Sequence, residues 1–115
     1  MSYEVRITRA EHWSESEKAP ITLAEWMAYV AQDPEMRLDG FAECEVEGST
    51  LRVESDGLAV WTRYSGNGVG GNMAWFDHHK GQVVVASPDH EILEKMRQIA
   101  RYFKARVMGD EGELY

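Results

Sequence analysis

The pattern that decides the fold lies in residues 73–85, Met-Ala-Trp-Phe-Asp-His-His-Lys-Gly-Gln-Val-Val-Val. Two apolar runs, Met73-Ala74-Trp75-Phe76 and Val83-Val84-Val85, flank the turn-forming residues His79-Lys80-Gly81. Short apolar runs bounded by turn residues predict two strands joined as an antiparallel hairpin. Because both runs are continuous rather than alternating, we expect central strands that are covered on both faces.

More strands are predicted on the N-terminal side of this hairpin. Residues 42–46 alternate apolar and acidic side chains, which predicts a strand with one acidic face. A turn at Gly48-Ser49 leads into residues 51–53, and residues 58–62 form another apolar run. Residues 3–8 also alternate, which predicts a first strand with one buried face.

A helix is predicted after residue 21. Thr22 and Glu25 form the pattern of a capping box, with Ile21 and Trp26 placed as a hydrophobic staple. Pro34 disfavours helical geometry at the preceding residue, so the helix should end near residue 32. The expected buried stripe consists of Leu23, Trp26, Met27 and Val30.

A second helix is predicted to begin with Ser87 as its cap and Pro88 as its first residue. Residues 105–108 should return as a last strand, whereas residues 9–20 and 35–40 are predicted to be a loop and a turn. The expected buried stripe of this helix consists of Ile92, Met96, Ile99 and Phe103.

This order of elements predicts an α+β fold. Consecutive strands with short connections favour a mainly antiparallel sheet, here of about five to seven strands, with two helices packed on it. The length of 115 residues fits one domain, so residues 1–115 are predicted to form a single α+β domain.

The charge of the chain limits its partners. The formal net charge of -8 disfavours binding to nucleic acids and to anionic membranes, and attracts a basic protein. The charge is also bipolar. Residues 33–56 contain eight acidic and two basic residues, whereas residues 95–106 contain five basic residues and no acidic one.

The sequence predicts a cytoplasmic protein. Cys44 is the single cysteine, so no intramolecular disulfide can form, and a reducing compartment is expected. The first residues lack the basic and apolar regions of a signal peptide. The longest uncharged run, which includes residues 65–76, is too rich in glycine to cross a membrane.

Two motifs invite a reading as catalytic or cofactor sites. Residues 66–71 match a glycine-rich nucleotide-binding pattern, but a strand rather than a helix is predicted to follow, which favours a flexible hairpin loop. Asp77 and His79 could share a metal ion with His90, although no established metal-ligand spacing is present. We therefore predict no catalytic residue, no cofactor and no firm metal site.

A protein-binding surface is the more strongly indicated kind of site. Three glutamates project from one predicted strand face, a second acidic group lies near the C-terminus, and a tryptophan lies in a polar segment. Acidic groups suit a basic partner, and tryptophan supplies binding energy at interfaces. The predicted contact residues are Trp13, Glu43, Glu45, Glu47, Asp110 and Glu111.

Four segments carry a resemblance to a known class of proteins. They are ITLAEW at residues 21–26, GLAVW at 57–61, AWF at 74–76 and GDEGELY at 109–115. With its small size and acidity, the chain resembles the bacterial immunity proteins that are encoded beside polymorphic toxins. The resemblance implies an inhibitor, and it transfers no functional residue because no assigned motif is matched.

The sequence thus favours a non-catalytic protein that neutralises a basic toxin or enzyme through an acidic surface. Two alternatives stay open. One is a small metal- or ligand-binding enzyme that uses Asp77, His79 and His90. The other is a structural or regulatory homo-oligomer, which uses either the sheet edge or the basic face of the second helix (Arg97, Arg101 and Lys104) against an acidic face.

Overall fold

The computed structural model describes residues 3–68 and 73–115, with the backbone alone at residues 41–46, 51 and 53. The strands are β1 (Glu4–Thr8), β2 (Met36–Leu38), β3 (Phe41–Val46), β4 (Ser49–Glu54), β5 (Leu58–Trp61), β6 (Trp75–His79), β7 (Gln82–Ala86) and β8 (Arg106–Gly109). The helices are the 3-10 helix η1 (Trp13–Lys18) and the α-helices α1 (Leu23–Gln32) and α2 (His90–Phe103).

The protein has an α+β fold built on a six-stranded antiparallel sheet, as predicted. The strand order is β2-β5-β6-β7-β1-β8, and β3 and β4 form a separate two-stranded sheet. The predicted hairpin of residues 73–85 is β6–β7, in which His79 pairs with Gln82 and Asp77 with Val84. Its turn contains Lys80 and Gly81, both with positive φ. The predicted glycine loop at 66–71 falls partly outside the described residues.

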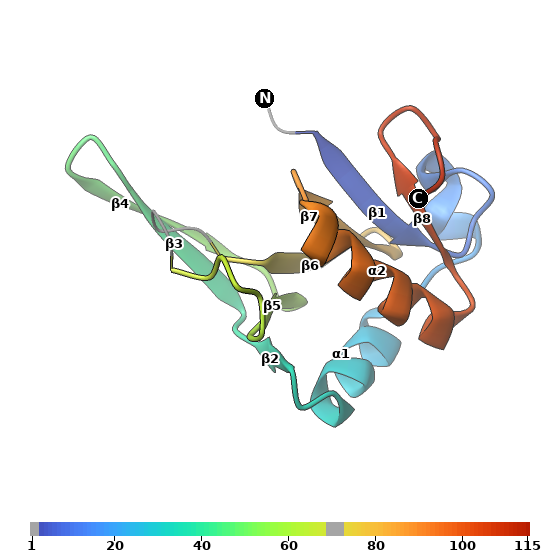
Figure 1. The fold of residues 1–115 in the computed structure, drawn as a ribbon, viewed down its shortest axis with the longest axis horizontal. Coiled ribbons are helices and arrows are strands. Elements are labelled where there is room, and N and C mark those ends of the chain that lie inside the picture. The colour runs from blue at the N-terminus through green and yellow to red at the C-terminus, as the bar shows by residue number, and fades with distance from the viewer. Residues whose placement is uncertain (1–2, 69–72) are drawn as a thin grey trace.

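Both α-helices lie on the same face of the six-stranded sheet (Figure 1). Alternate strand residues such as Ile7 and Phe76 are fully buried beneath them, together with Trp26 of α1 and Met96 of α2. The indole Nε1 of Trp26 donates a hydrogen bond to the Gly57 carbonyl oxygen at 2.7 Å, so this buried polar atom is satisfied. Burial of these large apolar side chains is the main stabilising contribution to the fold.

The expectation that the central strands are covered on both faces is wrong for β6 and β7. Trp75, Asp77 and Val84 point away from the helices and are partly exposed. The continuous apolar run in β7 therefore reflects one buried valine pair (Val83 and Val85) and one half-exposed valine between them, rather than a second covering layer.

The start and end of α1 are as predicted, but its buried face is only partly so, since Trp26 and Val30 of the predicted stripe are buried. The Thr22 hydroxyl accepts a hydrogen bond from the Glu25 amide at 3.1 Å, and the Glu25 carboxylate accepts one from the Thr22 amide at 3.0 Å. Leu23 and Met27 of the predicted stripe are exposed, at 36% and 38%, whereas Tyr29 is buried. The helix is thus rotated towards Phe103 of α2, whose ring contacts Tyr29.

Three other local predictions are wrong. Asp89 caps α2, because its carboxylate accepts a hydrogen bond from the Ile92 amide at 3.0 Å, whereas the predicted cap Ser87 has a φ of 46°. Residues 9–20 contain η1, and residues 35–40 contain β2. The predicted buried stripe of α2 and the last strand are confirmed.

Candidate functional site

The predicted acidic strand is part of a hairpin that projects from the rest of the protein (Figure 1). β3 and β4 pair along their whole length, so that Glu43 lies opposite Arg52 and Glu45 opposite Thr50. Glu47 and Gly48 form the turn with φ of 51° and 80°, which is the left-handed pair that a tight two-residue hairpin turn requires. The hairpin therefore holds the three predicted glutamates away from the six-stranded sheet.

Trp13 and Asp110, predicted from opposite ends of the sequence, are neighbours in the structure. The Trp13 indole donates a hydrogen bond to the Asp110 carbonyl oxygen at 3.1 Å. Trp13 is half-buried rather than freely exposed, because it belongs to η1 and its ring lies 3.8 Å from the guanidinium carbon of Arg6. The sequence did not indicate this contact, since Arg6 lies on the predicted polar face of its strand.

Arg6 is the centre of an ionic cluster. Its side chain donates to Asp110 Oδ1 at 2.5 Å and to Glu4 Oε1 at 3.1 Å, and the residue is 7% exposed. The backbone amide of Glu4 and the guanidinium of Arg6 hold the pKa of Asp110 below its usual range. Asp110 is therefore an internal partner of Arg6 and is less available for a contact with another protein than predicted.

The predicted contact residues fall into two groups at opposite ends of the molecule. Glu111 is exposed next to Asp110, in the turn after β8, whereas the β3–β4 hairpin lies at the far end of the longest axis (Figure 1). The extent of the molecule along that axis is 42 Å. A standard interface buries about 800 Å² per partner and does not span this length, so the two groups are separate surfaces.

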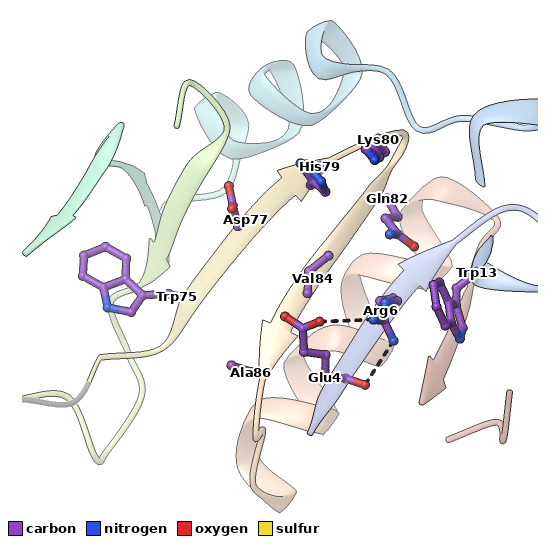
Figure 2. A pocket seen from close by; sticks show the side chains of 10 residues that line it. All are labelled: Glu4, Arg6, Trp13, Trp75, Asp77, His79, Lys80, Gln82, Val84 and Ala86. Atoms are coloured by element: carbon purple, nitrogen blue, oxygen red, sulfur yellow. Dashed lines mark hydrogen bonds and ion pairs between the residues drawn. The ribbon is translucent and has the colours of Figure 1, made fainter. Parts of the chain in front are cut away.

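A hollow of about 540 Å³ lies on the face of the sheet that the α-helices leave open (Figure 2). Trp75 and Trp13 stand at its opposite ends, and Val84 lies between them. Its size is within the range of small-ligand sites. Its lining comes from β1, β6, β7, the β6–β7 turn and η1, and consists of Glu4, Arg6, Trp13, Trp75, Asp77, His79, Lys80, Gln82, Val84 and Ala86.

The predicted metal candidates are only partly brought together. Asp77 and His79 lie on the same face of β6 and both line the hollow, whereas His90 is the first residue of α2 and does not. His78 points to the other face, where its Nε2 lies 2.6 Å from the Ile21 carbonyl oxygen. Among the side chains that the structure describes, which exclude those of residues 41–46, no group of three from His, Cys, Asp or Glu could hold a metal ion.

One buried ion pair was not predicted from the sequence. Lys95 of α2 is 3% exposed and donates to Asp33 at 2.8 Å and to Glu35 at 3.3 Å. Burial alone would raise the pKa of Asp33, but the hydrogen bonds from Lys95 and Tyr29 outweigh it and lower that pKa. Lys95 follows Ile92 by three residues and therefore lies on the same face of α2. This spacing could have indicated from the sequence that Lys95 is buried.

The fold and these surfaces define an antiparallel α+β domain with helices on one sheet face, a hollow on the other and a projecting acidic hairpin. No protein-family model, no curated protein and no solved structure matches the chain. In the part of the chain that the structure describes, no helix has the length and apolarity to span a membrane.

Proposed function

We propose that this chain is a cytoplasmic protein-binding module of the immunity type, which neutralises a basic toxin or enzyme. The observation that carries the proposal is the projecting β3–β4 hairpin (Figure 1). Residues 41–54 contain four glutamates and one arginine, in a protein whose formal net charge is -8. A projecting acidic element on an acidic protein attracts a basic surface and accelerates its association.

The base of the hairpin is tied to the six-stranded sheet by the backbone. The amides of Asp39 and Gly40 donate to the Leu58 carbonyl oxygen at 2.9 and 3.0 Å, and the Ser55 amide donates to the Gly40 carbonyl oxygen at 2.9 Å. These bonds fix both strands of the hairpin where they leave the six-stranded sheet. A hairpin held at its base loses less conformational freedom on binding than a free loop would, which favours affinity.

A groove with the opposite charge favours self-association as a second candidate function. The groove has a volume of about 310 Å³ and is lined by three arginines from α2 and β8, with apolar side chains between them. The arginines are Arg97, Arg101 and Arg106. The acidic hairpin of a second copy would complement it in a head-to-tail contact. Light scattering that shows a monomer at high concentration would contradict this second function.

Affinity capture from the native host lysate tests the first function. Wild-type protein is compared with Glu43→Lys/Glu45→Lys/Glu47→Lys at low and at high salt, and bound proteins are identified by mass spectrometry. The control, Glu11→Lys/Glu17→Lys/Glu94→Lys, changes the net charge equally at exposed positions outside the hairpin. We expect one basic protein, in near-equal amount, with wild type and control. Its absence, or its equal capture by the hairpin variant, would contradict the proposal.

A further inference from the structure

An indole and a carboxylate line each end of the hollow on the open sheet face (Figure 2). At the first end, the guanidinium of Arg6 lies against the ring of Trp13 and pairs with the carboxylates of Glu4 and Asp110. The ring and the two carboxylates contact one buried cation at distances of 2.5 to 3.8 Å. This end shows which chemistry the hollow accommodates: a planar cation held between an aromatic face and carboxylates.

The second end repeats these groups without a cation from the chain itself. Trp75 and Asp77 lie two residues apart on the same face of β6, about 7 Å along the strand. The cross-strand neighbours of Asp77 are Leu58 and Val84, which are both apolar. Its carboxylate accepts a hydrogen bond from the Ser55 hydroxyl at 2.7 Å. Within the described ranges, no cationic side chain pairs with Asp77 and no ring or cation stacks on Trp75.

The other charged groups of the hollow do not neutralise Asp77. Arg6 lies in the same cross-strand row, with Val84 between them, so the two positions are about 10 Å apart. The charge of Arg6 is already matched by its own two carboxylates. Lys80 is exposed in the turn beyond the end of β6, at the rim of the hollow. Asp77 is thus a partly buried carboxylate with one hydroxyl partner.

We propose that Trp75 and Asp77 form a subsite for an arginine side chain of the basic partner, and the identity of the donor rests on the proposed function. A guanidinium is flat and presents paired donors, so it donates to the Asp77 oxygens while the apolar stem of the same arginine lies along the Trp75 ring. Lone pairs of Asp77 that do not accept from Ser55 are available for these bonds. The subsite would select a partner with an exposed arginine and would act together with the hairpin.

Titration of the isolated protein with blocked arginine (N-acetyl-arginine amide) tests the subsite without the partner. The comparison ligand is N-acetyl-citrulline amide, which has nearly the same shape and no charge. We expect saturable shifts of the Trp75 indole N–H signal in NMR spectra, at least tenfold weaker with citrulline. Asp77→Asn should weaken arginine binding at least fivefold, whereas Asp77→Glu should retain most of it. The control Glu11→Gln, an exposed acid outside the hollow, should change nothing.

Two further variants keep the test decisive if Asp77→Asn disturbs folding. Trp75→Phe retains a ring and should bind arginine within about threefold of wild type, whereas Trp75→Leu should lose most binding. Binding to these two variants is followed by the backbone amide signals of Asp77 and Val84, because the indole signal is absent from both. Ser55→Ala removes the hydroxyl partner and should bind at least as well as wild type. Equal binding of arginine and citrulline, or arginine shifts confined to the hairpin, would overturn the inference.

Two more results distinguish the proposed subsite from a site for free arginine and from the proposed function. Tighter binding of free arginine than of the blocked form would contradict a protein-borne side chain, because only the free amino acid has its own carboxylate and amine. Arginine binding at Trp75 in a protein that captures no basic partner from lysate would refute the proposed function and keep the cation subsite. Equal capture of a basic partner by wild type and Asp77→Asn, with no NMR shifts on addition of arginine, would refute the arginine subsite and keep the proposed function.

Discussion

The six-stranded sheet and the β3–β4 hairpin are both antiparallel, yet they differ in what holds them. The sheet has two α-helices packed on one face and fully buried side chains such as Trp26 and Phe76 beneath them. The hairpin forms a separate two-stranded sheet that projects from the body. A two-stranded hairpin has little independent stability in water. Stability therefore resides in the body of the protein, which is the six-stranded sheet with its two α-helices, and the hairpin contributes little to it.

The largest expected effect is in the core of the body. Trp26→Ala removes a fully buried indole and leaves the Gly57 carbonyl oxygen without its donor, so the free energy of unfolding should fall by about 3–5 kcal/mol. Urea unfolding followed by circular dichroism measures this. Met27→Ala, at the adjacent but exposed position, should cost less than about 1.5 kcal/mol. Equal costs at both positions would contradict the observed rotation of α1.

The buried ion pair should give the next largest effect. Lys95→Met keeps the apolar stem but leaves the Asp33 carboxylate without its cation, which should cost about 3 kcal/mol at pH 7. Lys18→Met is the control, since Lys18 forms an exposed pair with Glu15 and should cost less than about 1 kcal/mol.

The pH dependence of this pair has a definite sign. The folded-state pKa of Asp33 is lowered, so the pair stabilises the protein above the unfolded-state pKa of about 3.9. This contribution is lost as the pH falls through the folded-state pKa. The deficit of Lys95→Met relative to wild type should therefore shrink below about pH 4. A deficit that stays constant from pH 7 to pH 3 would show that Asp33 and Lys95 are not coupled.

Two glycines in equivalent turns allow a direct comparison of the six-stranded sheet with the β3–β4 hairpin. Gly81, in the β6–β7 turn, and Gly48, in the hairpin turn, both have a φ of +80°. A Cβ at Gly81 would lie 2.8 Å from the Ser16 carbonyl oxygen, whereas at Gly48 it would meet nothing within 4 Å. Gly81→Ala should cost about 2–3 kcal/mol from backbone strain and overlap together, and Gly48→Ala about 1 kcal/mol from backbone strain alone. The reverse order would contradict the division between body and hairpin.

The smallest expected effect on stability is in the hairpin itself. Glu43→Lys/Glu45→Lys/Glu47→Lys should change the free energy of global unfolding by no more than about 1 kcal/mol, because the hairpin lies outside the six-stranded sheet and a like-charge pair opposite Arg52 costs at most about this much. Thermal unfolding followed by calorimetry checks it. A loss of several kcal/mol would mean that these positions support the fold, and the binding results for this variant would then need another explanation.

Local patterns predicted much of the fold. The capping box at Thr22 and Glu25, the apolar stripe of α2 and the β6–β7 hairpin all depend on residues close in sequence, and all are present. The stripe of α1 was predicted less well, because periodicity identifies apolar positions without showing which of them another element covers. Leu23 and Met27 have the spacing of core residues, yet they are 36% and 38% exposed.

The site was predicted less well, for a related reason. Alternation placed Arg6 on a polar face, but the partners that bury it, Trp13 and Asp110, come from residues 7 and 104 positions away. Lys95 and Asp33 are 62 positions apart. Contacts at such separations depend on the strand order, which no local pattern reveals. The acidic hairpin was predictable because its turn, its two strands and its charges are contiguous in the sequence.

The most direct test of the central claim is the association rate constant of the captured basic partner, measured by stopped-flow fluorescence at 50 and 200 mM salt. The account predicts that Glu43→Lys/Glu45→Lys/Glu47→Lys slows association at least tenfold at low salt and more than the matched control outside the hairpin, with the difference shrinking as salt screens the charges. Association of the hairpin variant at the rate of the control, at both salt concentrations, would contradict the claim that the hairpin recognises the partner.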